Sequence, residues 1–446
     1  MAGRIALSSI VAGAFLLVVF STGRASQLVP RSTFAFPDWE AGPLHFLFGQ
    51  PTLGYTGMND ALSVFLIAML LAYGAAMLAV RSLSMRAIAV AVVAVHVILL
   101  LQPPAQLNDV FNYLGYARLG IVHHINPYAH AIRSEVYDPV YDFTTWRNLR
   151  SPYGPLFTAI TYPIAMLPLP VAYWVLKTVM VLASLGFIAI VWKTATLLNR
   201  DPRFAVLFVA ANPIYLFYAV GGFHNDFFML VPSTAAIMLL LMRRDRAAGA
   251  AVMIAVAVKF TAVLLLPFLL IGAVPPQRRL RVIAGAAIGA LVLAAMSLVI
   301  FGLHIPDVKD QSSILTPFSF PNLVGLLAGA GGGSPTILRL AVVLLIPVVV
   351  YFLRRRGDWI TGVGWSTIAL ICSLSWVMPW YVVWVLPLAA LGKSVMLRRA
   401  AIVMTVFLLL TFLPVTGVYL SKHGIKLLGS PVGQASQHLQ AKLAGS

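Results

Sequence analysis

The sequence predicts an all-α, polytopic integral membrane protein. Hydrophobic residues make up 60% of the 446 residues and charged residues only 10%, whereas soluble chains are nearer half apolar and a quarter charged. The apolar residues also gather in runs long enough to cross a bilayer, which takes about 20 helical residues. Such runs must be helices, because lipid cannot hydrogen-bond an exposed backbone amide. This composition excludes a soluble globular domain.

Long apolar runs mark the expected spans from the N-terminus onward. Clear examples are residues 5–22, 61–80, 203–222, 280–302 and 400–420. We expect the first run to be a retained helix, because no convincing small-residue cleavage site of a signal peptide follows it. The whole pattern predicts about eleven full spans. The single cysteine, Cys372, excludes a disulfide within the chain.

The formal charge of +18 is concentrated in short joints between the apolar runs. The positive-inside rule places these joints and the N-terminus in the cytoplasm. Nucleic acid is excluded as a partner because no soluble basic domain is present, and an excess of basic residues suits anionic membrane lipids. The six joints are residues 81–86, 193–203, 243–246, 278–281, 354–356 and 393–399.

The three long segments 23–60, 102–156 and 303–335 then lie outside the membrane. Of the 13 acidic residues, Asp201, Asp245 and Asp358 lie inside and the other ten outside, so we expect the chemistry to face the exterior. The segment 303–335 ends in a glycine run, Gly329 and Gly331 to Gly333, which predicts a flexible loop over the site. The tail 421–446 is expected to be external and amphipathic, lying on the membrane surface.

Two segments do not fit a simple span. Residues 156–168 are too short and contain Pro163 and Pro168, so we expect an interfacial or half-inserted helix before the true span near 170–192. Residues 247–275 begin and end at cytoplasmic arginine clusters. They are therefore expected to form a re-entrant pair of short helices, about 20 Å per arm, with Lys259 near the apex.

The external segment after residue 102 carries the most informative polar pattern. Asp109, Asn112, Tyr113 and Tyr116 are spaced i, i+3, i+4 and i+7, so they share one helical face. A carboxylate at the membrane boundary is partly desolvated, which makes it a better general base. The alternative is that Asp109 only caps this helix.

Motifs in a fixed order extend this pattern toward the C-terminus. The motifs are Asp109-Val110 with Tyr113, Ala117 to Gly120, Asn126 to Tyr128, Tyr153 to Leu156, Gly221 to Asp226, Lys259 with Leu264 to Phe268, and Pro379 to Tyr381 with Trp384. The set resembles the GT-C superfamily of membrane glycosyltransferases, which use polyprenyl-phosphate sugars, although additional spans precede the Asp109 segment here. It is most similar to the actinobacterial α-mannosyltransferases that build lipomannan and phosphatidylinositol mannosides.

The resemblance implies one GT-C domain over residues 1–446 and an inverting transfer that needs no metal or cofactor. Asp109 would deprotonate an acceptor hydroxyl, which attacks the anomeric carbon as the lipid phosphate departs. The implied partners are a polyprenyl-phosphate sugar donor, a glycolipid or lipoglycan acceptor, and membrane lipids. The implied location is the cell membrane, with the active site facing the exterior.

The departing phosphate gathers negative charge and needs cations or hydrogen-bond donors. Lys259 and Lys177 are candidates because ionisable groups at membrane depth are costly and mark functional sites. Arg118 is a third candidate, since a guanidinium can bind phosphate through two hydrogen bonds. Snorkelling to the interface is the alternative for the lysines, and simple solvation is the alternative for Arg118.

Sugar and acceptor binding is expected from polar and aromatic residues at the outer helix junctions. Asp226 is the main rival of Asp109 as the base, and Asp60 is another rival. A metal site at His123, His124 and His130 is disfavoured because adjacent histidines point apart and no suitably spaced acid accompanies them. The expected binding residues are His224, Asn225, Asp226, Tyr113, Tyr153 and Trp380.

Two other functions stay open from the sequence. A flippase or transporter of lipid-linked sugars would also explain half-helices and an intramembrane lysine. A GT-C enzyme for arabinose or glucose is the second possibility, because a few hydroxyl contacts decide sugar identity. A nucleotide-sugar donor is disfavoured, since the cytoplasmic loops are short and hold no soluble domain.

Overall fold

The computed structural model describes residues 1–22, 37–44, 47, 53–306, 310, 313–329 and 335–445. Within these ranges every regular secondary-structure element is a helix, and one isolated β-bridge joins Ala131 to Arg150. The all-α prediction is therefore confirmed. Gly331 to Gly333, which carry much of the predicted flexible loop, lie outside the described residues.

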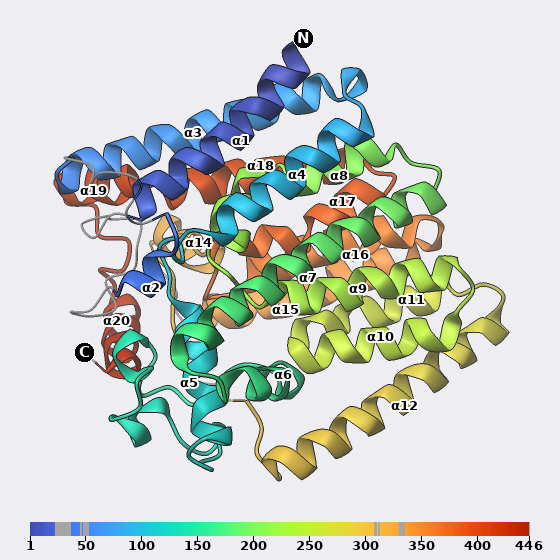
Figure 1. Ribbon diagram of the computed structural model, residues 1–446. Coiled ribbons are helices and arrows are strands. Elements are labelled where there is room, and N and C mark those ends of the chain that lie inside the picture. Colours follow the sequence, from blue (N-terminus) through green and yellow to red (C-terminus); the bar gives the residue numbers. More distant parts are fainter. Residues whose placement is uncertain are drawn as a thin grey trace.

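The N-terminal helices pack along one side of the bundle (Figure 1). Helix α1 (Ala2–Ser21) lies against α3 (Tyr55–Leu78) and α4 (Met85–Leu100). Their contact faces are apolar, with Leu17 and Leu66 nearly or fully buried. Moving such side chains from lipid into a helix–helix interface gains little hydrophobic free energy, because lipid tails are equally apolar. Close packing therefore stabilises these helix pairs.

A layer of short elements precedes the longest helix of the chain. It contains α2 (Asp38–Ala41), α5 (Asp109–Ile121) and α6 (Pro155–Ala165), followed by α7 (Leu169–Leu197). Helix α6 has 11 residues and α7 has 29. The predicted short helix before a full-length helix is therefore present.

The middle of the chain is built from interrupted helices. Helix α8 (Pro202–Ala210) leads into a π-helical segment, η4 (Tyr215–Val220), and α9 (Asp226–Leu241) follows. Next, α10 (Asp245–Val258) stops at Lys259, and a 3-10 turn, η5 (Phe260–Leu264), continues into α11 (Leu265–Gly272). The chain reverses after Lys259, so both ends of this pair lie toward one side (Figure 1). The two short arms and their junction at Lys259 are present, and their re-entrant course in the membrane stays a prediction.

The C-terminal half contributes two long, highly exposed helices and several short ones. The long ones are α12 (Pro276–Phe301) and α15 (Pro335–Arg354). Helix α20 (Pro431–Ala444) rests on the segment 146–149, because Asn148 N donates a hydrogen bond to the Leu443 carbonyl at 2.9 Å. The remaining elements are α14 (Phe320–Leu327), α16 (Trp359–Ser373), η7 (Pro379–Trp384), α17 (Leu386–Leu391), α18 (Val395–Thr411), α19 (Pro414–Lys422) and α20 (Pro431–Ala444).

The predicted number of about eleven full spans is not confirmed. In the described chain five helices are long and apolar enough to cross a membrane, or six if α18 and α19, bent by 58°, form one span. Other apolar stretches are divided into helices of 10–17 residues. One predicted span, 203–222, is divided into α8 and the π-helical segment η4, with Pro213 between them, which a count of apolar residues does not register.

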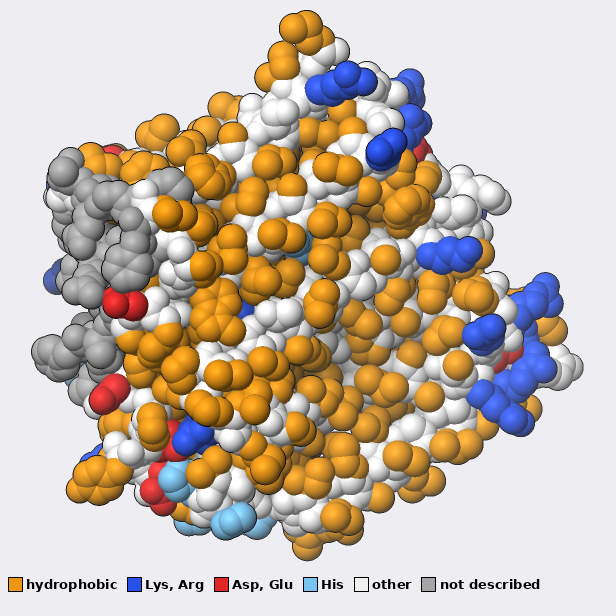
Figure 2. Space-filling model, viewed as in Figure 1, with side chains coloured by type: hydrophobic (Ala, Val, Ile, Leu, Met, Phe, Trp, Pro, Cys, Tyr) orange, Lys and Arg blue, Asp and Glu red, His pale blue; other side chains and the backbone are white. Residues whose placement is uncertain are grey.

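Charged side chains are sorted to opposite ends of the molecule. Figure 2 shows lysine and arginine along the upper right edge, acidic and histidine side chains at the lower left, and a broad hydrophobic face between them. This arrangement is that of a multi-pass membrane protein, whose apolar band lies between two polar rims.

Candidate active site

Asp109 is the first residue of helix α5. Its Oδ2 lies 3.2 Å from Nδ1 of His224, and its Oδ1 accepts a hydrogen bond from Asn112 Nδ2 at 3.4 Å. The N-cap residue of α5 is Asn108, so the alternative that Asp109 only caps the helix is not what the structure has. The Asp109 side chain is 17% exposed and the His224 side chain 2%. Asp109 is therefore the accessible member of this pair.

A tight turn between η4 and α9 carries His224. Phe223 has a φ of 52°, a left-handed conformation that is uncommon for a bulky side chain. A Cβ on Gly222 would lie 2.2 Å from the Tyr218 carbonyl, so only glycine fits there. The His224 ring stacks on Trp380 with centroids 3.6 Å apart. Strained turns of this kind concentrate at functional sites, and here the strain orients the imidazole toward Asp109.

Asp226 follows two residues later as the first residue of α9. Its Oδ1 accepts hydrogen bonds from Lys259 Nζ at 2.8 Å and from Trp384 Nε1. Its Oδ2 is buried and has no hydrogen-bond partner among the described residues. A buried polar atom without a partner is costly, so this oxygen points to a ligand group that donates to it.

Lys259 reaches Asp226 from the junction of α10 and η5. The aromatic faces of Tyr381 and Trp384 lie 5.1 and 4.8 Å from its Nζ, within cation–π range. The position of this junction depends on Gly154, whose N donates to the Val258 carbonyl at 3.2 Å. Because the Lys259 side chain is still 24% exposed, the ammonium keeps donors for a ligand.

Tyr113 lies near the carboxylates of both Asp109 and Asp226. Its hydroxyl accepts a hydrogen bond from Asn225 N at 3.2 Å. Burial raises the Tyr113 pKa well above its usual range, and the negative charges of Asp109 and Asp226 raise it further. The Tyr153 ring packs edge-on against it at 4.8 Å. Tyr113 thus lies near both acids and contacts the turn that leads from His224 to Asp226.

Arg118 has structural partners within the external loop. Its Nε donates to both oxygens of Asp138 at 2.9 and 3.0 Å, and its Nη1 donates to the Ala165 carbonyl at 3.1 Å. Burial favours the neutral form of Asp138, but the hydrogen bonds from Arg118 and His123 outweigh it and lower the Asp138 pKa. The structure does not bring Arg118 to the two carboxylates, and its predicted role with phosphate stays a prediction.

Lys177 is likewise enclosed away from these acids. Its Nζ donates to the Gln102 carbonyl at 2.6 Å and is fully buried.

Asp60 lies on α3 with its side chain exposed, and His123 pairs with Asp138 at 2.6 Å. The described residues hold no group of three His, Cys, Asp or Glu side chains that could bind a metal ion.

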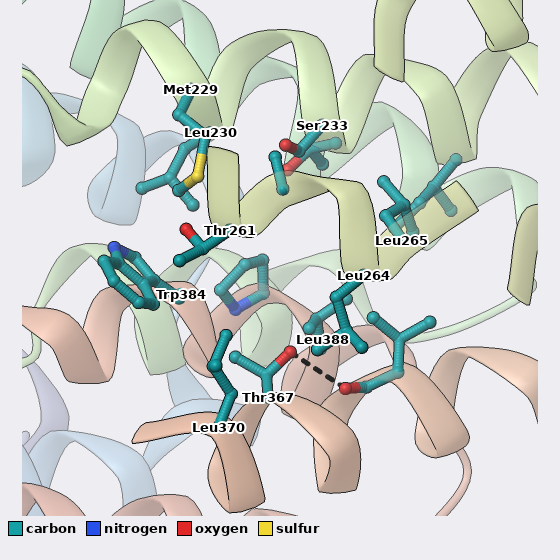
Figure 3. A pocket seen from close by; sticks show the side chains of 15 residues that line it. Met229, Leu230, Ser233, Thr261, Leu264, Leu265, Thr367, Leu370, Trp384 and Leu388 are labelled. Carbon is teal, nitrogen blue, oxygen red and sulfur yellow. Dashed lines mark hydrogen bonds between the residues drawn. The ribbon is translucent and has the colours of Figure 1, made fainter. Parts of the chain in front are cut away.

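An apolar groove with a cavity volume of about 60 Å³ begins beside this site. Its walls come from α9, η5, α11, α16 and the η7–α17 segment (Figure 3). Trp384, which donates to Asp226, lines one end, together with Thr261, whose buried hydroxyl has no partner among the described residues. Leu264, Leu265 and Leu388 lie on the side away from Trp384 (Figure 3). The groove therefore has a polar end near Trp384 and Thr261 and apolar walls beyond it.

Sequence reasoning missed some residues that complete the site. Trp384 and Tyr381 were expected only as motif residues, and their contact with Lys259 gave no sequence signal. Gln102 and Glu40 were not singled out, because nothing in their local sequence shows that both become buried.

Two family models match this chain over overlapping ranges. Residues 152–414 match glycosyltransferase family 87, and residues 11–275 match a family described as alpha-(1->6)-mannopyranosyltransferase, N-terminal domain. Each match covers more than half of the 446 residues. The chain belongs to glycosyltransferase family 87. The resemblance inferred from the ordered motifs is thereby confirmed.

Curated relatives of this family 87 chain come from actinobacteria. It is 28% identical over 345 residues to alpha-(1->6)-mannopyranosyltransferase A of Mycobacterium tuberculosis, covering 68% of this chain and 64% of the relative. It is 24% identical over 311 residues to alpha-(1->6)-mannopyranosyltransferase A of Corynebacterium glutamicum, covering 60% and 63%. The chain thus matches less than two thirds of the length of these relatives. No solved structure matches it.

Proposed function

We propose that this protein transfers a mannosyl residue from a polyprenyl-phosphate donor to a hydroxyl of a glycolipid or lipoglycan. The transfer occurs at the outer face of the membrane and inverts the anomeric configuration. The observation that carries the proposal is the Asp109–His224 contact at 3.2 Å, formed on the same turn that leads to the Asp226–Lys259 pair. Family membership supports the sugar-transfer chemistry, and the names of the relatives support mannose as the sugar.

Asp109 is the proposed general base. It is more exposed than Asp226, and its partner is an imidazole rather than an ammonium. Asp226 is buried, and its Oδ1 already accepts hydrogen bonds from Lys259 and Trp384. In the proposed step the acceptor hydroxyl gives its proton to Asp109 while its oxygen bonds to the anomeric carbon.

Lys259 is the proposed electrostatic partner of the leaving group. The bond between the anomeric carbon and the phosphate oxygen breaks, and its electron pair stays on that oxygen. An ammonium that is partly exposed and fixed by Asp226 can donate to the phosphate at no reorganisation cost. Asp226 Oδ2, which has no partner in the described chain, is proposed to accept from a sugar hydroxyl, with His224, Asn225, Tyr113, Tyr153 and Trp380 around it.

The groove supports a lipid-linked donor. Its apolar walls suit an isoprenoid chain, whereas a soluble sugar donor would gain nothing from contact with Met229, Leu264 and Leu388. The outward orientation rests on the basic rim, which the positive-inside rule places in the cytoplasm, while Asp109 lies in the opposite external segment.

The test uses the full chain, purified in nanodiscs, with radiolabelled polyprenyl-phosphomannose and a mannosylated glycolipid acceptor. Asp109→Asn is expected to lower kcat by roughly 10²- to 10⁴-fold, the usual contribution of a general base. Asp60→Asn, an exposed acid on α3, is the matched control and should keep wild-type turnover.

Near wild-type turnover of Asp109→Asn would remove it as the base. If Asp226→Asn alone lost activity, the role would pass to Asp226. The same assay with polyprenyl-phosphate glucose and arabinose tests the sugar: mannose should give the highest kcat/KM, and preference for another sugar would overturn that part of the proposal. Labelled donor that crosses the bilayer without product would favour a transporter.

A further inference from the structure

The amino group of Lys177 lies in a closed aromatic chamber rather than in the groove. Its Nζ is 3.8 Å from the Trp174 ring centroid and 4.6 Å from those of Tyr173 and Phe223. The side chain is fully buried, and its one hydrogen bond in the described chain is to the Gln102 carbonyl at 2.6 Å. Aromatic faces and a carbonyl replace the water lost by this amino group. A phosphate group has no open path to it.

Both segments that carry the Asp109–His224 contact meet at this chamber. The Lys177 bond fixes Gln102, seven residues before Asp109. Phe223, whose ring faces Nζ, directly precedes His224. Lys177 therefore contacts both the segment before Asp109 and the residue before His224.

A second set of contacts links the same two segments directly. The Gln102 side-chain Nε2 donates to the Gly221 carbonyl at 3.3 Å, and Ala105 N donates to it at 2.9 Å. A Cβ on Gly221 would lie 2.5 Å from that Nε2, so the approach requires glycine. Lys177, Gln102 and Gly221 thus form a continuous path from α7 to the turn that carries His224.

The external helix α2 closes the chamber from the other side. The Tyr173 hydroxyl donates to the Glu40 carbonyl at 3.2 Å, and Trp174 Nε1 donates to the Trp39 carbonyl at 2.9 Å. The Glu40 side chain is buried and acts electrostatically on Lys177. The rings that surround Nζ are therefore held in place from both sides.

We infer that Lys177 is a positioning residue, which fixes the segments before Asp109 and His224 so that the two side chains meet, and is not a ligand of the donor phosphate. This inference rests on the proposed function of the Asp109–His224 site. A positioning residue acts on the geometry of the reacting groups, so its loss lowers kcat while ground-state binding of the donor is kept. A phosphate ligand would instead contribute to donor binding as well.

The test compares Lys177→Met with Lys193→Met in the full chain in nanodiscs. Lys193 lies on the same helix with an exposed side chain and is the matched control. We expect Lys177→Met to lower kcat by about 10²-fold, the effect of a displacement near 1 Å, with the donor KM changed less than about threefold. A fall in kcat accompanied by a donor KM raised tenfold or more would overturn the inference, as would wild-type kcat.

Gln102→Leu is the second variant, for use even if Lys177→Met does not fold. It keeps the backbone carbonyl that binds Lys177 and removes only the link to Gly221, so a smaller loss of kcat at constant KM is expected. Wild-type kcat in Gln102→Leu would count against the path through Gly221. Failure of the proposed function is separate: it would appear as an active Asp109→Asn, whatever the lysine variants do.

Discussion

An ion pair between Lys259 and Asp226 links two interruptions of the helix bundle. Nζ of Lys259 lies 2.8 Å from Oδ1 of Asp226. Lys259 separates α10 from η5, and Asp226 begins α9 after the strained turn at Phe223. The helix dipole at the start of α9 favours the carboxylate, and the carboxylate in turn fixes the ammonium. Neither charge would be stable at this depth alone.

The first prediction concerns this pair. Lys259→Met should lower kcat by roughly 10²- to 10³-fold, the usual effect of removing one transition-state donor. It should also destabilise the protein by about 3 kcal/mol, because Asp226 is left as a buried, unpaired charge. Turnover and thermal unfolding in detergent measure the two effects separately.

The double variant Lys259→Met/Asp226→Asn separates stability from chemistry. With the orphaned charge removed, thermal stability should return toward the wild type while turnover stays low. Lys422→Met, an exposed lysine at the end of α19, is the control and should change neither. Recovery of turnover in the double variant would show that Lys259 acts only by neutralising Asp226.

The polar residues of this site could be predicted because they break the apolar rule. Asp109, His224 and Lys259 stand at ends or interruptions of apolar runs. Removing a polar or charged group from water there is costly, so a functional role is expected. Their pairing could not be predicted. Asp109 meets His224 across 115 residues of sequence, and local periodicity carries no information on such contacts.

The cations illustrate the same limit in physical terms. From the sequence, Lys259, Lys177 and Arg118 were all candidates for binding the donor phosphate. Burial and partners distinguish them: Lys177 is fully enclosed, Arg118 is bound to Asp138, and Lys259 is partly exposed beside the groove. The predicted number of spans is not confirmed for a related reason: an interruption such as the π-helical segment Tyr215–Val220 shortens helices without reducing hydrophobicity.

The second prediction tests the contact that positions Lys259. A Cβ on Gly154 would lie 2.2 Å from the Ala257 carbonyl and 2.5 Å from the Val258 carbonyl, both of them backbone atoms. Gly154→Ala should therefore displace the end of α10, cost about 1–3 kcal/mol of stability and lower kcat at least tenfold. Both effects are measured on the purified chain.

Gly186→Ala is the matched control for this substitution. Gly186 lies within α7, and a Cβ there would meet no atom within 4 Å. Alanine is also the better helix former, by about 1 kcal/mol, so stability should be unchanged or slightly higher. Equal behaviour of the two alanine variants would contradict the role assigned to the Gly154 contact.

The third prediction is a pH dependence of stability that originates at Glu40. Burial raises the Glu40 pKa from 4.5 to about 8, although the charge of Lys177 acts to lower it. The folded protein therefore keeps a proton that the unfolded chain releases, so this contribution to stability is present below pH 4.5 and is lost as the pH rises toward 8. At 1.36 kcal/mol per pH unit the loss amounts to roughly 5 kcal/mol.

Glu40→Gln keeps the neutral shape and removes the ionisable proton. We therefore expect the melting temperature of the wild type to fall between pH 5 and pH 8 by several degrees more than that of the variant, with the variant the more stable protein at pH 8. Asp38→Asn, an exposed acid on the same helix α2, should leave the wild-type slope unchanged. Parallel melting curves for wild type and Glu40→Gln over this range would mean that Glu40 does not hold a proton in the folded state, and the chamber around Lys177 would then contain a charged pair.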